Sequence, residues 1–201
     1  MHKIKLISII LSSLLIVSLL TSTTFATKFY KAKPFEFDPG STGIVSAAWV
    51  THQGLTDAGK SNHALYLTKN GTTVTNAASG AKVEGVEGIT LTEIGWDVRT
   101  DGHCGAGAPR FNVVTDDNVL HFIGCNSPAP ISISALVDPQ GNTWERRRYD
   151  PATAFPPILP GSTIKSIDIV FDEGTDQGVG YAFLDNIDIN GTLIGKPGNA
   201  Q

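Results

Sequence analysis

Residues 171–191, FDEGTDQGVGYAFLDNIDING, carry the clearest structural pattern in this chain. In the second half of this stretch, apolar and other residues alternate, which is typical of a β-strand. The alternation predicts one apolar face with Asp185 in its middle. That face would comprise Tyr181, Phe183, Ile187 and Ile189. A carboxylate among apolar side chains is costly unless hydrogen-bond donors or a metal ion compensate it, so Asp185 is the first candidate site residue.

Short segments of the same kind recur along the rest of the chain, separated by turn sequences such as Asn70-Gly71. The expected strands are residues 44–52, 63–69, 72–75, 89–99, 110–115, 119–125, 131–137, 143–149, 164–172 and 180–190. No segment has a convincing amphipathic helical pattern. This spacing predicts an all-β protein, a two-sheet antiparallel β-sandwich of jelly-roll type. We expect an N-terminal leader at 27–43, the sandwich domain at 44–195 and a flexible tail at 196–201.

Residues 1–26 have the pattern of a cleaved secretory signal peptide, with Lys3 and Lys5 before an apolar stretch that ends at Thr-Phe-Ala. The apolar stretch is short for a membrane span, and no later stretch is long enough to cross a bilayer. We therefore expect a secreted or cell-surface protein with no membrane span in the mature chain. Two of the 15 Lys and Arg residues lie in the signal, which leaves 13 against 19 acidic residues and a formal charge of −6. This balance argues against nucleic acid and anionic membranes as partners.

The two cysteines, Cys104 and Cys125, both lie in the mature part of the chain. An even number of cysteines in an exported protein predicts a disulfide bond. A zinc site with His103 and His121 is the alternative. It has poor geometry, because His103 and Cys104 are adjacent and the other pair is spaced widely along a strand.

Acidic residues around the closing strand make a structural calcium ion a candidate cofactor. The loop 172–176, DEGTD, offers hard oxygen ligands just before that strand. If the first and last strands lie side by side, the leader adds another carboxylate. The candidate calcium ligands are therefore Asp38, Asp172 and Asp185. In the alternative interpretation, Asp185 accepts backbone N–H bonds in a turn and the loop acids are solvated.

A polar set in the middle of the chain is the candidate ligand-binding face. It comprises Asp97, Arg99, Asp101, Arg110, Asn112 and His121. Strand alternation could line several of these side chains along one groove, where arginine–carboxylate pairs and amides suit sugar hydroxyls or a carboxylated sugar. A histidine near an aspartate could instead act as a general base, although no motif identifies a nucleophile. The structural alternative is that Arg99 and Arg110 pair with neighbouring aspartates and stabilise a hairpin.

Aromatic residues could supply a surface on which sugar rings stack. The candidates are Trp49, Tyr66, Trp96, Trp144 and Tyr149. Trp49 and Trp96 lie in strongly apolar runs and are expected in the core. Trp144 and Tyr149 flank three consecutive arginines, 146–148, which we expect at a solvated edge, so these two aromatic residues are the better candidates for exposure.

Residues 183–191, FLDNIDING, resemble the closing strand of secreted jelly-roll domains that include carbohydrate-binding modules. This resemblance implies a structural calcium at Asp185. Residues 97–113, DVRTDGHCGAGAPRFNV, resemble a recurring motif of exported microbial proteins of unassigned function. The leading hypothesis is a non-catalytic binding module for carbohydrate or glycan. The alternatives are a secreted polysaccharide-active enzyme, either a lyase or a hydrolase, and a cell-surface structural protein.

Overall fold

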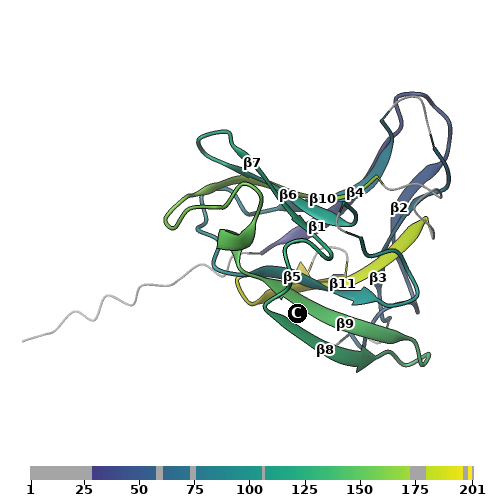
Figure 1. Ribbon diagram of the computed structural model, residues 1–201. Helices are drawn as coiled ribbons and strands as arrows, with labels where there is room; N and C mark the ends of the chain where they lie inside the picture. Colours follow the sequence, from purple (N-terminus) through teal and green to yellow (C-terminus); the bar gives the residue numbers. More distant parts are fainter. Residues whose placement is uncertain are drawn as a thin grey trace, which may run out of the picture.

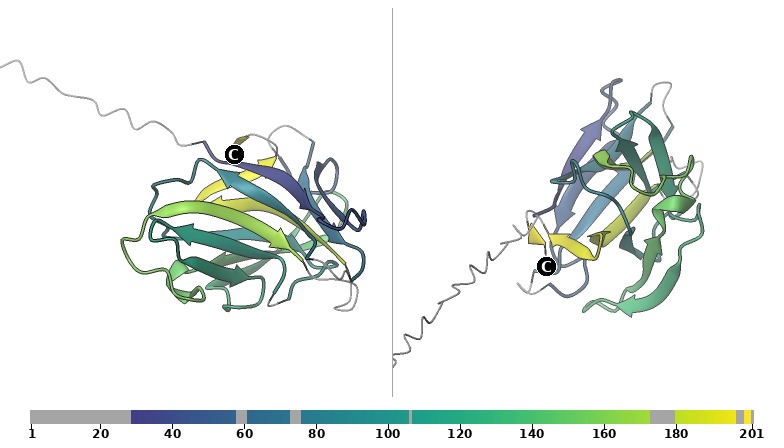
Figure 2. Two further views of the ribbon diagram at one scale, coloured as in Figure 1. Left: turned by 90° about the horizontal axis from the view of Figure 1, so that it is seen from above. Right: turned by 90° about the vertical axis from the view of Figure 1, so that its left-hand side faces the viewer.

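The computed structural model describes residues 29–57, 61–72, 76–105, 107–172, 180–196 and 199–200. The predicted signal peptide lies outside the described residues. The described chain forms two antiparallel sheets that pack face to face (Figure 1), and Figure 2 shows the same two layers from two further sides. This arrangement confirms the predicted two-sheet β-sandwich and is compatible with a jelly-roll-like fold. No helix in the described part of the chain is long and apolar enough to cross a membrane.

The smaller sheet has five strands in the order β1-β4-β10-β6-β7. These strands are β1 (Lys31–Phe37), β4 (Ala78–Glu84), β10 (Ile164–Phe171), β6 (Arg110–Thr115) and β7 (Leu120–Gly124). A short 3-10 turn, Pro151–Thr153, follows residues 143–149, a strand of the larger sheet.

The larger sheet has the order β13-β12-β11-β5-β9-β8, and β3 pairs with the first half of β11 and with β2. Its strands are β2 (Val45–Val50), β3 (Ala64–Lys69), β5 (Ile94–Arg99), β8 (Ser132–Val137), β9 (Thr143–Tyr149), β11 (Tyr181–Ile189), β12 (Thr192–Lys196) and β13 (Asn199–Ala200). The closing strand β11 therefore lies inside this sheet, between β5 on one side and β3 and β12 on the other.

Both ends of the predicted domain differ from expectation. Strand β1 lies within the predicted leader and pairs along its whole length with β4, so the sandwich begins at Lys31. Ala32 is buried in the core, and its carbonyl accepts a hydrogen bond of 2.8 Å from the Trp49 indole, which ties β1 to the other sheet. Strand β13 lies within the predicted tail. Because β1 belongs to the opposite sheet from β11, the first strand and the closing strand are not neighbours as the calcium hypothesis required.

The core between the sheets is organised around Trp96, which stacks on Phe111 of the facing sheet with 4.1 Å between ring centroids and meets Tyr149 edge to face. Tyr149 and Trp144 are fully buried, so the expectation that they are exposed is wrong. Arg148 is also buried, so the expectation that arginines 146–148 lie together at a solvated edge is wrong. Strand β9, which carries these residues, is an inner strand between β5 and β8.

A β-bulge at Asn186 divides β11 into two halves with opposite orientation. Asp185 pairs with Asp97 and Asp188 pairs with Gly95, so β11 has one more residue than β5 between these pairs. Asn186 has a φ of 44°, in the left-handed region that asparagine tolerates. An extra residue exchanges the two faces of a strand.

The exchange of faces changes which side chains reach the core. Before the bulge, Ala182 and Leu184 face the core, and after it Ile187 and Ile189 do. Phe183 belongs instead to a second apolar cluster on the outer face of the sheet, and Tyr181 packs against that cluster. The predicted single apolar face through Tyr181, Phe183, Ile187 and Ile189 is therefore wrong.

Candidate functional site

An open groove with an aromatic floor lies on the outer face of the larger sheet. Its volume is about 350 Å³, and it is lined by Val50, Gln53, Tyr66, Tyr181 and Phe183. Tyr66 and Phe183 are paired across strands β3 and β11, with 4.8 Å between ring centroids. The Tyr181 ring lies 5.7 Å from Phe183 and 6.3 Å from Tyr66. Three neighbouring rings thus form one apolar floor.

The polar rim of the groove is organised by Arg99. Its guanidinium carbon lies 3.5 Å from the centre of the Phe183 ring, within the range of a cation–π interaction. Its Nε donates to Asp101 Oδ1 at 2.7 Å, and its Nη1 donates to Gln53 Oε1 at 2.8 Å. Only 7% of Arg99 is exposed, so its charge is used inside the protein, whereas the Asp101 side chain is 49% exposed. The rim therefore presents a carboxylate and an amide to solvent.

The loop that carries Gln53 is attached to the sheet through Asp185. The backbone N–H of Leu55 donates to Asp185 Oδ2 at 2.7 Å, and that of Asn186 donates to Oδ1 at 2.7 Å. Burial raises the pKa of Asp185 to about 8; the two N–H donors oppose this rise, and the charges of Asp57 and Asp97 add to it. Asp185 thus accepts backbone N–H bonds, as the alternative to the calcium hypothesis expected. Residues 58–60 of this loop lie outside the described residues.

Asp97 is the centre of a buried ion-pair network beside this attachment. It is 0% exposed and receives two 3.0 Å hydrogen bonds from Arg146. The Asn186 amide donates to it at 2.8 Å, and Arg148 Nη1 lies 3.5 Å away. Arg148 Nε also lies 2.6 Å from Asp188 Oδ2. The hydrogen bonds to Asp97 raise the pKa of Arg146 above its usual value. Because Asp97 is buried and bonded to these protein groups, it stabilises the sheet and does not reach a ligand at the surface.

The other predicted ligand-binding residues lie in the smaller sheet. Arg110 binds the Asp172 carboxylate with both terminal nitrogens, at 2.6 and 2.8 Å, and donates from Nε to Asn112 at 3.0 Å. The ring of His121 contacts the Thr115 hydroxyl at 3.0 Å and the Pro156 carbonyl at 2.7 Å. The six predicted residues therefore do not line one groove. Only Arg99 and Asp101 meet at the aromatic site, and both predicted arginines pair with aspartates as the structural alternative expected.

The three predicted calcium ligands are also separate. Asp38 accepts hydrogen bonds from the Thr42 hydroxyl and the Gly43 N–H within its own turn. Asp172 is bound by Arg110, and Asp185 by backbone donors. Within the described ranges, no group of three or more His, Cys, Asp or Glu side chains is placed to hold a metal ion. The remainder of the acidic loop, residues 173–176, lies outside the described residues.

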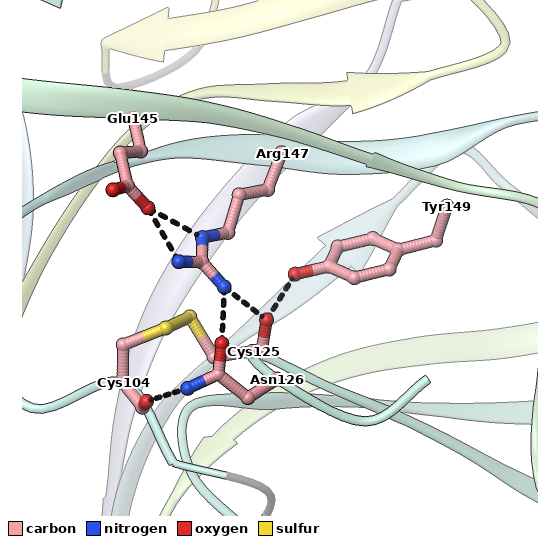
Figure 3. The surroundings of a disulfide bond; sticks show 6 residues. All are labelled: Cys104, Cys125, Asn126, Glu145, Arg147 and Tyr149. Atoms are coloured by element: carbon pink, nitrogen blue, oxygen red, sulfur yellow. Dashed lines mark hydrogen bonds and ion pairs between the residues drawn. A yellow bond between two sulfur atoms is a disulfide. The ribbon is translucent and has the colours of Figure 1, made fainter. Parts of the chain in front are cut away.

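The predicted disulfide between Cys104 and Cys125 is present, and it lies in a hydrogen-bond network that joins the two sheets (Figure 3). Arg147 and Tyr149 of β9 both donate to the Cys125 carbonyl, at 2.7 and 2.8 Å. The Asn126 amide donates to the Cys104 carbonyl at 2.6 Å. Burial raises the pKa of Tyr149 to about 12, so its hydroxyl remains a donor at neutral pH.

No protein-family model, curated protein or solved structure matches this chain. Sequence reasoning placed Tyr66, Arg99 and Asp101 among the candidates but put Tyr181 and Phe183 on the same apolar face as Ile187 and Ile189. The pair Asp185-Asn186 was the available signal, because asparagine favours the left-handed conformation that such a bulge needs.

Proposed function

We propose that this protein is a secreted, non-catalytic carbohydrate-binding module whose aromatic groove binds a neutral glycan. The observation that carries this proposal is the floor of Tyr66, Tyr181 and Phe183 beneath a polar rim. Aromatic rings pack against the C–H faces of sugars, while carboxylate and amide groups bind sugar hydroxyls. A volume of about 350 Å³ suits a short stretch of glycan.

The charges around the groove favour a neutral ligand over an acidic one. The guanidinium of Arg99 lies over the Phe183 ring of the floor, and its charge is paired with Asp101. The half-exposed Asp101 carboxylate would repel an anionic sugar and accept hydrogen bonds from hydroxyls. The amide of Gln53, oriented through Oε1 by Arg99, would donate from Nε2 to a sugar oxygen.

The groove is better suited to binding than to bond cleavage. Hydrolysis of a glycosidic bond ordinarily uses two carboxyl groups on either side of the bond. The five lining residues include no aspartate, glutamate or histidine, and the rim carboxylate of Asp101 is held by Arg99. These features support a module that retains its ligand unchanged.

A glycan array tests the proposal, using protein recovered from the secreted fraction of a host that expresses the whole chain. We expect binding to neutral oligosaccharides without release of new chain ends. Tyr66→Ala and Tyr181→Ala should each weaken that binding by roughly tenfold or more, because each removes part of the stacking surface. Phe37→Ala is the matched control, since Phe37 is 53% exposed but lies on β1 of the other sheet.

Two results would overturn the proposal. One is the absence of binding to any neutral glycan by a folded protein. The other is binding that both tyrosine variants retain in full. Release of new ends from a bound polysaccharide would instead favour the alternative of a lyase or hydrolase.

A further inference from the structure

Strand β8 is an unprotected edge of the larger sheet. It pairs with β9 on one side, and no described strand pairs with its other side (Figure 1). Ile131, Ile133 and Val137 are 59%, 57% and 64% exposed. Edge strands are ordinarily protected by charged residues, an internal proline or a bulge. The segment 131–137, ISISALV, contains no charged residue and no proline. Its strand part, Ser132–Val137, pairs with β9 in an uninterrupted register, and Ile131 lies in a bend just before it.

We propose that β8 pairs antiparallel with β8 of a second copy of this chain, which joins the two larger sheets into one across a two-fold axis. Such a pairing satisfies the backbone groups of both exposed edges. It also covers the exposed apolar side chains of both copies. The proposal is independent of the glycan site, which lies on β3 and β11.

The side-chain pattern of β8 selects one register. When the axis passes through Ser134, Ile131 lies opposite Val137 of the second copy, and Ile133 lies opposite Ala135. Residues 132–136 are then paired along the strand, and Ile131, whose N–H already donates to the Arg148 carbonyl of β9, packs beside Val137 of the second copy. If the pairing shifted by one residue, Ile133 and Val137 would meet the face that carries Ser132 and Ser134. If it shifted by two residues, part of the exposed apolar row would have no apolar partner in the second copy. The strand is thus complementary to itself in this register.

The two faces of the joined sheet are also compatible with a second copy. Ile133, Ala135 and Val137 share a face, opposite Arg147, Glu145 and Thr143 of β9. An axis perpendicular to the sheet keeps this face on the same side in both copies, so their apolar rows form one stripe. The other face brings Ser132 opposite Leu136. Because the strand carries no charge, two copies meet without repulsion, and a charged partner strand finds no complementary group on β8 itself.

A cysteine at the axis tests both the dimer and its register. Cys104 and Cys125 are bonded to each other and no free cysteine is present, so an introduced thiol is the only one. Directly opposite residues have Cα atoms about 4.5–5.5 Å apart, within the range of a disulfide. Ser134→Cys should therefore form a covalent dimer under mild oxidation. Ser132→Cys is the matched control, because its symmetry mate lies about 13 Å away along the strand.

Sedimentation equilibrium of the protein from the whole chain provides a second test. Wild type should show a concentration-dependent monomer–dimer equilibrium, and Ile133→Lys should weaken dimerisation at least tenfold by placing like charges near the axis. Leu120→Lys, the same change at an exposed residue of the other sheet, should leave it unchanged. Three results would overturn the proposal. The wild type could remain monomeric at every concentration, or Ile133→Lys and Leu120→Lys could have equal effects. Ser134→Cys could also form no more covalent dimer than Ser132→Cys. If Ile133→Lys fails to fold, the cysteine pair still decides the question.

Discussion

The Asp185 carboxylate accepts a 2.7 Å hydrogen bond from the backbone N–H of Leu55, a residue 130 positions earlier in the chain. This bond attaches the loop after β2 to the closing strand, next to the aromatic groove. Gln53, which lines the groove, lies two residues before Leu55 and is bound to Arg99. Asp185 therefore supports the proposed binding site from below, without belonging to its surface.

Stability should fall as the pH rises from about 4 towards 8, because folding raises the pKa of Asp185 from 3.8 to about 8. Between these values the folded state holds a proton that the unfolded state has lost. The resulting stabilisation is complete below the lower value and is lost as the pH passes the higher one, by at most about 1.4 kcal/mol per pH unit. Urea denaturation at several pH values measures this slope.

Asp185→Asn isolates the contribution of this carboxyl group to the pH dependence. The amide cannot ionise, so the slope should flatten. The variant should also lose about 1–3 kcal/mol, since an amide can accept from only one of the two N–H donors without opposing donors at the other. An unchanged slope in the variant would show that other groups account for the pH dependence.

Gly54→Ala should disrupt the loop that lines the groove. A Cβ at this position would lie 2.0 Å from the His63 carbonyl oxygen and 2.8 Å from Asp185 Oδ2. The backbone must shift, and we expect a loss of about 1–3 kcal/mol in stability together with weaker glycan binding. Gly141→Ala is the control. Gly141 has open space around it and a φ of 88°, so the change tests backbone strain alone, in the β8–β9 turn, which does not line the groove. Full glycan binding by Gly54→Ala would contradict the role assigned to the loop.

Asp97→Ala should destabilise the protein by about 3–5 kcal/mol, because it removes the partner of Arg146 and one partner of the buried Arg148. Asp101→Ala removes the carboxylate partner of the buried Arg99, but Asp101 is itself half exposed and Arg99 keeps its bond to Gln53, so we expect a smaller cost of about 1–3 kcal/mol. Chemical denaturation compares the two variants. If both lose the same amount, the buried network does not stabilise the fold as its geometry implies.

Loss of the disulfide should lower stability without changing the fold. By the loop-entropy estimate, a Cys104→Ala/Cys125→Ala variant loses about 3 kcal/mol. The hydrogen bonds from Arg147, Tyr149 and Asn126 still hold the two carbonyl groups in place (Figure 3). Circular dichroism should therefore show native strands with a lower melting temperature. A reductant should shift wild type towards the variant and leave the variant unaffected.

Chelation decides between calcium and backbone donors as the partners of Asp185. Both Asp185 oxygens are used by N–H groups, so we expect the melting temperature to be the same with and without a calcium chelator. A decrease of several degrees in wild type, absent from Asp185→Asn, would instead establish the calcium hypothesis.

The local pattern was sufficient for the fold class and for the disulfide, because both depend on residue type and short-range spacing. It was also sufficient to place Arg99 beside Asp101, whereas Asp172, the partner of Arg110, lies 62 positions away and is brought near by the pairing of β6 with β10. It failed for Trp144 and Tyr149, because flanking charges suggest exposure, whereas the sheet order places β9 inside the sheet. It failed for β1 because a strand that contains Pro34 is weakly marked in the sequence and is stabilised by its pairing with β4 along its whole length.

The orientation of Tyr181 and Phe183 shows most clearly what the sequence determines and what only the tertiary structure decides. Alternation along the chain predicts that residues 180–190 form a strand, because a strand exposes its two faces in turn. Which face reaches the core depends on the pairing with β5, where the bulge at Asn186 inserts one residue and reverses the second half. A single inserted residue is invisible to periodicity but places the rings of Tyr181 and Phe183 on the opposite face of the sheet from Ile187 and Ile189. The candidate binding groove therefore exists because of strand pairing between residues almost ninety positions apart, Asp97 and Asp185.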